Sequence, residues 1–407
     1  MPMSIHTAAE LVAGRIRNSG YVEIIAHHDA DGIAAGSILA HAMARAGLRF
    51  RLRIRGDMIP EDLSRDQAYL LCDIGAGMEK LPKETMVVDH HEAHFTGEYH
   101  VNPRLSGLDG DRELSASGTA YLVANRLGDN RDLAGLAMLG MIGDAQFLSG
   151  MNLSIFNDGV ANGIITVGRG LRLPGRDLPE QLLMASGPVI EGVSGDEAAA
   201  KMIAGSPGGS GTADLKQALS ICALSAIRNH NAACVEAIYG DTYGLDREVV
   251  PDAHSLAAVI DACGKAGHGD IGAALCLRYS RDLGAAWEIA RQHRLKVIAS
   301  FRTATVQTDT AGIYEVESPD IASDVAEALS CRSTPQVPIA VIARSGTACR
   351  ISARCPEGTA VDLGAAVRTL AQACRGSGGG HRSRAGATIP CESLEAFRKG
   401  WAAAVAA

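Results

Sequence analysis

Strand-like segments alternate with helix-like segments through the first 150 residues, and this alternation constrains the fold more than any other feature. An alanine-rich segment that ends at a glycine, residues 32–47, predicts a helix between the first two strands. Such alternation is typical of a mostly parallel sheet, so we predict an α/β domain with helices on both faces of that sheet. The predicted strands, rich in Val, Ile, Leu and Tyr, are residues 21–26, 49–54, 68–74 and 85–89.

The C-terminal part of the chain predicts a second, smaller α/β domain. Residues 204–214, rich in Gly, Ser and Pro, indicate a linker or an exposed loop before it. The expected domain boundaries are 1–200, 201–289 for a linker and mixed helical segment, and 290–407. Within the last of these we predict strands at residues 295–301, 311–318, 338–344 and 349–354, and helices at about residues 321–330 and 363–375.

The composition excludes several classes of protein. A net charge of −8 argues against a protein that coats nucleic acid, which would be basic. Aromatic residues make up 4% of the chain, so base stacking on aromatic side chains is not its general mode of recognition. No apolar run approaches the roughly 18–20 residues that span a membrane, and the N-terminal segment has the pattern of an amphipathic helix rather than a signal peptide. We therefore expect a cytoplasmic protein with no membrane contact.

Ten cysteines are scattered along the chain without any Cys-x-x-Cys pair. This spacing indicates neither a zinc knuckle nor a disulfide scaffold. Most of the cysteines lie in apolar stretches, where a free cysteine behaves as a small hydrophobic residue. We therefore expect them in the core.

Acidic residues and histidines gather at the ends of predicted elements. His-His-Asp-Ala-Asp-Gly (27–32) follows the first strand, Asp73 ends the third, residues 89–91 (Asp-His-His) end the fourth, and Asp144 follows an apolar helix. In open parallel sheets, ligands bind beyond the carboxyl ends of the strands. All four clusters can therefore face one crevice.

These clusters predict a metal site. Carboxylates and imidazoles without a thiolate suit Mn²⁺ or Mg²⁺, and there are more of them than one ion requires. Two ions about 3.5–4 Å apart would use them all, bind phosphoryl oxygens and activate a water for displacement at phosphorus. Each cluster alone also has an ordinary interpretation, such as a turn or a helix N-cap. Their occurrence together, each at the end of a strand or helix, favours the metal site.

The order H-x-D-x-D-G, a strand-ending Asp, D-H-H and G-D resembles the four motifs of the DHH phosphoesterase superfamily. Residues 378–386 (GGGHRSRAG) resemble the G-G-G-H signature of its DHHA1 partner domain. Residues 102–124 and 252–277 are similar to the corresponding segments of archaeal RecJ-like proteins. The resemblance implies a DHH domain followed by a substrate-binding DHHA1 domain, with the active site in the cleft between them.

The resemblance also implies a role for each matching residue. Asp73 matches the carboxylate that bridges the two ions, and His91 matches a histidine that faces the scissile phosphate. Asp89 would orient His90, and His28 has no counterpart with a role. Bacterial RecJ nucleases carry Asp where this chain has His27, so their substrate length does not transfer. The implied metal ligands are His27, Asp29, Asp31, Asp73, His90 and Asp144.

The C-terminal signature implies substrate contacts. Glycine lacks a Cβ atom, so the backbone N–H groups of three successive glycines can approach an anion closely, and the following histidine adds a donor. Ser352 and Arg354 match a pair that contacts the substrate backbone. The implied substrate-binding residues are Ser352, Arg354, Gly378, Gly379, Gly380 and His381.

Four arginines keep two interpretations open. Arg384 stands where relatives carry alanine, and it either contacts a phosphate or reaches solvent. Arg51, Arg53 and Arg55 share one face of a strand, because they alternate along it. They either follow a phosphate backbone or form a charged edge that discourages aggregation.

These observations favour a metal-dependent phosphodiesterase that degrades single-stranded DNA or RNA from an end. Threading one strand between two domains would exclude a duplex. An alternative is a phosphodiesterase for oligoribonucleotides or cyclic dinucleotides, which fits the acidic net charge and His27. Another is a protein that binds the replicative GINS complex, as some archaeal RecJ-like proteins do, with secondary nuclease activity. The sequence leaves open polarity, DNA or RNA preference, substrate length, the metal used and oligomeric state.

Overall fold

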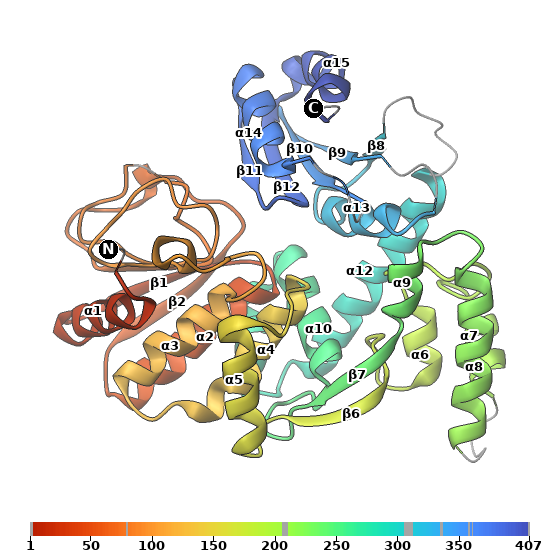
Figure 1. Ribbon diagram of the computed structural model, residues 1–407, viewed down its shortest axis with the longest axis horizontal. Helices are drawn as coiled ribbons and strands as arrows, with labels where there is room; N and C mark the ends of the chain where they lie inside the picture. Colours follow the sequence, from red (N-terminus) through yellow and green to blue (C-terminus); the bar gives the residue numbers. More distant parts are fainter. Residues whose placement is uncertain are drawn as a thin grey trace. The chain divides into compact units, whose positions relative to one another are not determined.

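The computed structural model describes residues 3–78, 80–205, 211–304, 312–333, 337–356, 359 and 361–405 (Figure 1). The chain divides into two compact units, Met1–Gly168 with Asp241–Ala290 and Arg169–Gly240 with Arg291–Ala407. The middle segment expected at 201–289 is thus shared between them. Part of the expected linker, residues 206–210, lies outside the described residues.

The first unit contains a five-stranded sheet in the order β2-β1-β3-β4-β5, in which every neighbouring pair is parallel. The expected mostly parallel α/β sheet is therefore confirmed. The strands are β1 (Val22–His27), β2 (Phe50–Arg55), β3 (Tyr69–Cys72), β4 (Met86–Val88) and β5 (His100–Val101).

Helices α2 and α3 lie along the sheet of the first unit (Figure 1). Gly36 of α2 permits a close approach, because a Cβ atom there would lie 2.7 Å from the Cβ of Ala26 in β1. On the opposite face, Ile25 and Leu71 pack against Met58 and other residues of the loops after β2 and β3. The α-helices of this unit are α1 (Ile5–Asn18), α2 (Ala30–Arg45), α3 (Ala116–Leu127), α4 (Ala134–Gly143), α5 (Gly150–Ala161), α10 (Ala253–Lys265) and α11 (Gly269–Cys276).

The second unit contains a five-stranded sheet in the order β11-β12-β10-β9-β8, in which only β8 and β9 run parallel. Helix α13 (Ala322–Ser330) packs on one face, and α14 (Leu363–Ala373) and α15 (Leu394–Val405) pack on the other. The strands are β8 (Ile313–Val316), β9 (Ile339–Ser345), β10 (Ala348–Arg354), β11 (Ser377–Gly380) and β12 (Arg384–Pro390).

The remaining elements connect these regions. The chain passes between the units within β6 (Thr166–Leu171), β7 (Tyr239–Gly244) and α12 (Leu283–Ala304). The strand predicted at residues 295–301 was wrong, because this segment lies in α12. Its apolar residues Val297, Ile298 and Phe301 recur at helical spacing and are buried. The other helices are α6 (Leu178–Leu183), α7 (Glu197–Ala204), α8 (Gly211–Ala226) and α9 (Ala232–Glu236).

Four cysteines form pairs that their spacing did not indicate, although two of them, Cys331 and Cys349, are buried as expected. Cys234 pairs with Cys331, and Cys349 pairs with Cys391, in disulfides whose Cα atoms lie 5.6 and 5.1 Å apart. The partners are 97 and 42 residues apart in sequence, so no local spacing could reveal them. The free cysteines are Cys72, Cys222, Cys263, Cys276, Cys355 and Cys374.

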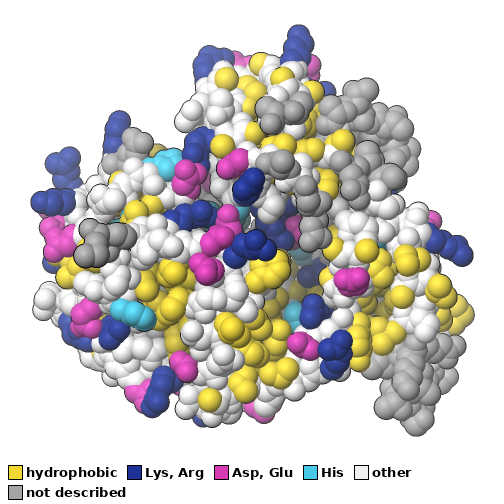
Figure 2. Space-filling model, in the orientation of Figure 1, with side chains coloured by type: hydrophobic (Ala, Val, Ile, Leu, Met, Phe, Trp, Pro, Cys, Tyr) yellow, Lys and Arg dark blue, Asp and Glu magenta, His cyan; other side chains and the backbone are white. Residues whose placement is uncertain are grey.

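Two further features bear on the expectations from composition. Within the described ranges, no helix combines the length and apolar character needed to cross a membrane. Lys and Arg side chains are interspersed with Asp and Glu on the face that Figure 2 shows. Any attraction for a polyanion is therefore local on this face.

Candidate metal centre

Four clusters of predicted site residues meet at one edge of the first sheet. His27 ends β1, Asp73 directly follows β3, and residues 89–91 directly follow β4. These three strands are neighbours and parallel, so their carboxyl ends share one edge. Asp144 joins them at the C-terminus of α4, which packs against α2.

The tight turn from β1 into α2 places two carboxylates. Asp29 is the N-cap of α2, where its Oδ1 accepts a hydrogen bond of 3.0 Å from the backbone N–H of Gly32. Gly32 is required in this turn, because a Cβ atom would lie 2.6 Å from the carbonyl oxygen of His27. Asp31 follows in the first turn of α2 and is fully buried.

His27, Asp29 and Asp73 form the first group of possible metal ligands, with ligand atoms within 4.8 Å of one another. His27 Nδ1 lies 2.8 Å from Asp29 Oδ2 and 3.4 Å from Asp73 Oδ2. Asp73 has a φ of 58°, a left-handed conformation that Asp tolerates better than most residues.

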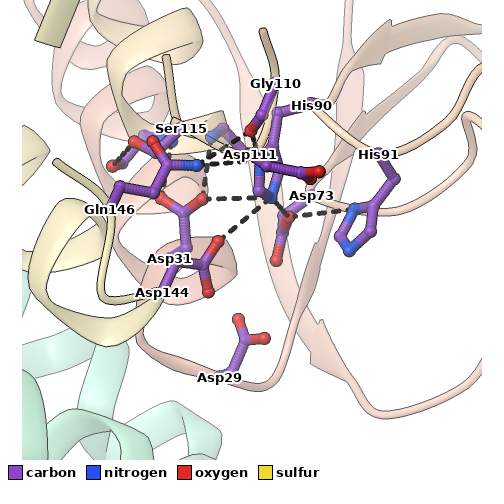
Figure 3. A network of polar contacts seen from close by, with 12 residues as sticks. Asp29, Asp31, Asp73, His90, His91, Gly110, Asp111, Ser115, Asp144 and Gln146 are labelled. Carbon is purple, nitrogen blue, oxygen red and sulfur yellow. Dashed lines mark hydrogen bonds and ion pairs between the residues drawn. The ribbon is translucent and has the colours of Figure 1, made fainter. Parts of the chain in front are cut away.

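Asp31, His90 and Asp144 form the second group, also within 4.8 Å. Figure 3 shows the ring of His90 among the carboxylates of Asp31, Asp73 and Asp144. Its Nε2 atom lies 3.1 Å from Asp144 Oδ2, 3.4 Å from Asp73 Oδ1 and 3.7 Å from Asp31 Oδ2. Asp73 therefore directs one oxygen toward His27 and the other toward His90, and stands between the two groups.

Residues outside the motifs hold this arrangement. The Nδ1 atom of His90 lies 2.7 Å from the carbonyl oxygen of Gly110, which fixes it as the protonated nitrogen and leaves Nε2 to face the carboxylates. The N-terminus of α3 donates to Asp31 from Ala116 N–H at 2.7 Å and Ser117 N–H at 2.8 Å. Gly140 of α4 gives Asp31 room, because a Cβ atom there would lie 1.7 Å from Asp31 Oδ1.

Sequence reasoning missed Gly110, Gly140 and the N-terminus of α3 as parts of the site. The similarity of residues 102–124 to RecJ-like proteins was a signal for Gly110 and for α3. Nothing in the local pattern distinguishes Gly140 from the other glycines of its apolar helix.

The roles expected for residues 89–91 are refined by the structure. Asp89 accepts hydrogen bonds from the backbone N–H of His90 at 2.7 Å and of His91 at 3.1 Å. Its Oδ1 atom also lies 2.8 Å from Nδ1 of His91. The ring that Asp89 orients is thus that of His91, whereas the ring of His90 is oriented by Gly110.

The crowded carboxylates raise one another's pKa. Burial, followed by the charges of Asp144 and Asp73, raises the pKa of Asp31 to about 8. Burial, followed by the charge of Asp29, also raises the pKa of Asp73. Burial alone lowers the pKa of His90, but contacts with Asp144 and Asp73 raise it well above its ordinary value.

The donor set fits a divalent cation. Buried carboxylates of like charge need a compensating positive charge, and bound protons supply it only in part. Oxygen and imidazole nitrogen donors suit Mn²⁺ or Mg²⁺. The residues that would hold the cations are the six predicted from the sequence, His27, Asp29, Asp31, Asp73, His90 and Asp144.

The predicted substrate-binding residues all lie in the second unit. Ser352 and Arg354 are in β10, and the three glycines are in β11, an edge strand. Gly378 has a packing role, because a Cβ atom would lie 3.0 Å from the Cβ atoms of Ala371 and Ala387. Gly380 has a φ of 140° and leads through His381, whose backbone N–H donates to the carbonyl of Arg384, into β12.

The open questions about the arginines are partly answered. Arg384 does not simply reach solvent, because it pairs with Glu327 at 3.3 Å. Arg53 pairs with Glu23 of the neighbouring strand β1. Arg51 and Arg55 are exposed on β2, which is the edge strand of its sheet.

Comparison with known proteins finds a family model for the C-terminal part of the chain and a relative for nearly all of it. Residues 309–407 match the model of the DHHA1 domain. An uncharacterized protein of Methanocaldococcus jannaschii is 24% identical, over 94% of this chain and 93% of its own.

Solved structures that resemble the whole chain include a RecJ and a CDC45. RecJ of Thermus thermophilus in complex with Mn²⁺ is 18% identical with a TM-score of 0.63, over 99% of this chain and 54% of RecJ. The chain thus spans about half the length of that RecJ. CDC45 of Entamoeba histolytica is 13% identical with a TM-score of 0.64, over 100% of both chains.

Proposed function

We propose that this chain is a RecJ-like member of the DHH/DHHA1 superfamily and a metal-dependent phosphodiesterase that degrades single-stranded nucleic acid from an end. The observation that carries the proposal is the carboxylate of Asp73. It stands between two groups that each combine an imidazole with a further carboxylate. This is the arrangement expected of a bridging ligand in a two-metal site.

When bound, divalent cations would polarise phosphoryl oxygens and lower the pKa of a water molecule that attacks phosphorus. The chain's own residues fix where this happens. Gly110 and the N-terminus of α3 hold His90 and Asp31 by hydrogen bonds, so both ligands are positioned before a cation or substrate arrives. Asp31, Asp73 and His90 are buried, which limits the positions that their side chains can adopt.

His91 is the residue we propose for direct contact with the phosphoryl group. Asp89 accepts a hydrogen bond of 2.8 Å from its Nδ1 atom. Burial lowers the pKa of His91, but Asp89 raises it above its ordinary value, so the ring also holds the imidazolium proton on Nε2 that it can donate. The side chain is 35% exposed, so a substrate can reach it, whereas the side chain of His90 is 1% exposed. A donor aimed at developing negative charge stabilises the transition state.

We assign nucleotide binding to the DHHA1 domain. Ser352 of β10 lies opposite Gly386 of β12, which lies opposite Gly379 of β11. The two glycines carry no side chain of their own. A Cβ atom at Gly386 would meet only the carbonyl oxygen of Ile351, at 3.5 Å, and one at Gly379 would lie 3.6 Å from Nε of Arg368. Sugars and phosphates can approach such a surface closely.

A second candidate function is hydrolysis of short oligoribonucleotides or cyclic dinucleotides. The net charge of −8 and the interspersed charges of Figure 2 favour it, because a long polyanion would gain little general attraction. Binding to a replication complex such as GINS is a further proposal, which the likeness to CDC45 makes worth testing by pull-down with an inactive variant.

One experiment separates these functions. End-labelled ladders of single-stranded DNA and RNA are digested with Mn²⁺, with Mg²⁺ or with a chelator, beside a variant lacking the Asp73 carboxylate. We expect progressive shortening from one end in the presence of metal only. Cleavage confined to the shortest oligonucleotides would favour the second candidate, and metal-independent cleavage would contradict both.

A further inference from the structure

Two arginines of the DHHA1 domain lie directly opposite each other. Arg354 of β10 and Arg384 of β12 are partners in the antiparallel register. Like charges at such positions destabilise a sheet, so the pair needs a compensating group or a function. Their side chains are 13% and 28% exposed, which places both within reach of solvent and of a ligand.

The compensating group is Glu327 of α13. Its Oε2 atom accepts a hydrogen bond of 2.8 Å from Nε of Arg354, and its Oε1 atom one of 3.3 Å from Nη2 of Arg384. One carboxylate thus bridges two guanidinium groups. Asp324, one turn earlier in α13, lies 2.8 Å from Nε2 of His293 and is engaged by that ring.

The carboxylate of Glu327 does not use all the N–H donors of the two guanidinium groups. Nη1 of Arg354 donates to the carbonyl of Ala353 at 2.9 Å. Within the described part of the chain, Nη2 of Arg354 and both Nε and Nη1 of Arg384 donate no hydrogen bond. Guanidinium groups suit the oxygens of a phosphate, which they bind by charge-assisted and often paired hydrogen bonds.

The arginine pair adjoins the strip formed by Ser352, Gly386 and Gly379. Arg354 and Ser352 alternate along β10 on the face that is half-buried, and Arg384 and Gly386 are their partners on β12. The strip and the pair therefore form one continuous surface of the domain. A chain of nucleotides lying on this strip would bring a backbone phosphate to the two arginines.

We propose that Arg384 acts with Arg354 to bind one backbone phosphate of a single-stranded nucleic acid, and that Glu327 keeps the two cations together and competes with that phosphate. This inference rests on the proposed function, because it extends the substrate contacts of the same domain. Arg384 stands where the family pattern has alanine, so it gives this chain a contact that Arg354 alone would not provide.

The main test compares Arg384→Ala with Arg344→Ala. Arg344 is an exposed arginine at the far end of β9, opposite Cys349 of β10, so both variants lose one positive charge. Binding of a labelled single-stranded oligonucleotide to the full chain is measured by anisotropy in a chelator, over a range of salt concentrations. We expect Arg384→Ala to weaken binding about tenfold at low salt and to reduce the slope of log K against log salt by about 0.7. Equal effects of the two substitutions would overturn the proposal.

Glu327→Gln tests the competition. Gln keeps the size of the side chain and removes its negative charge, so the arginines should bind the oligonucleotide several-fold more tightly at low salt, with the advantage fading as salt screens it. A purely structural ion pair would instead change the melting temperature and leave affinity unaltered, and that result would contradict the competing role.

A minimal substrate separates this inference from the proposed function. Hydrolysis of bis(p-nitrophenyl) phosphate with Mn²⁺ reports the first unit, and we expect Arg344→Ala to retain it near the wild-type rate. A wild-type chain that hydrolyses no phosphodiester would defeat the proposed function. A wild-type chain that is active while Arg384→Ala and Arg344→Ala bind alike would defeat this inference alone.

Discussion

The two units collect charge in opposite ways. The first buries Asp31, Asp73 and His90 at the edge of a parallel sheet, where their side chains are at most 1% exposed. The second keeps Arg354 and Arg384 partly exposed on an antiparallel sheet, with Glu327 between them. Buried like charges are compensated by bound protons or by a cation, whereas the partly exposed arginines share one carboxylate and keep donors that can bind an anion. In the proposed function, one unit holds metal and cuts, and the other holds the nucleic acid.

Removal of the bridging carboxylate tests this division most severely. Asp73→Asn is preferable to alanine, because Asn tolerates the left-handed conformation of residue 73. We expect hydrolysis to fall by at least about a thousandfold. Loss of a crowded buried carboxylate should also leave metal-free thermal stability unchanged or higher. Initial rates with metal and melting curves in a chelator measure these two effects. Retained turnover would contradict the assignment of cleavage to the Asp73 site of the first unit.

Gly140→Ala tests whether the space around Asp31 matters. The new Cβ atom would lie 1.7 Å from Asp31 Oδ1, so the carboxylate must move. We expect weaker Mn²⁺ binding in calorimetry and a loss of about 1–3 kcal/mol in the free energy of unfolding.

Gly14→Ala in α1 is the matched control for Gly140→Ala. A Cβ atom there meets nothing within 4 Å, and alanine favours a helix by up to about 1 kcal/mol. Equal metal affinity in the two glycine variants would show that Asp31 is not a ligand.

His91→Ala distinguishes a residue that contacts the phosphoryl group from a residue that binds metal. We expect the rate to fall about 10²–10³-fold while Mn²⁺ affinity stays near normal, because His91 is proposed to contact the phosphoryl group. The Nδ1 atom of His91 lies 3.5 Å from Asp73 Oδ1, so the opposite assignment is testable. Loss of a bound Mn²⁺ in His91→Ala would make this residue a ligand.

The smallest expected effect is on pH dependence. The unfolded chain ionises Asp31 near an ordinary pKa of about 4, whereas the folded metal-free chain holds that proton up to about 8. The stabilisation from this proton is therefore complete below about pH 4 and is lost as pH rises through about 8. Melting curves in a chelator should show this decline, and Mn²⁺ affinity should rise over the same range because binding releases the proton. A flat profile for both would contradict the crowding of Asp31.

Much of the first unit could be predicted because its chemistry coincides with strand ends. A strand-ending acidic residue is visible in sequence, and parallel strands bring such residues to one edge. The carbonyl of Gly110 could not be assigned to His90, 20 residues away, because nothing periodic links them.

The contacts of the second unit were harder to predict, because their partners lie far apart in the sequence. Glu327 lies 27 residues from Arg354 and 57 from Arg384, and only the register of β10 with β12 brings the arginines together. The segment at 295–301 was misread as a strand because a short apolar run fits either a strand or a buried helix.

Anomalous diffraction at the manganese edge, from crystals of the chain soaked in Mn²⁺, tests the central claim most directly. We predict two peaks in the first unit, both within coordination distance of the Asp73 carboxylate, one beside His27 and Asp29 and the other beside Asp31, His90 and Asp144. A single peak that Asp73 does not contact, or no peak at this edge of the sheet, would contradict it.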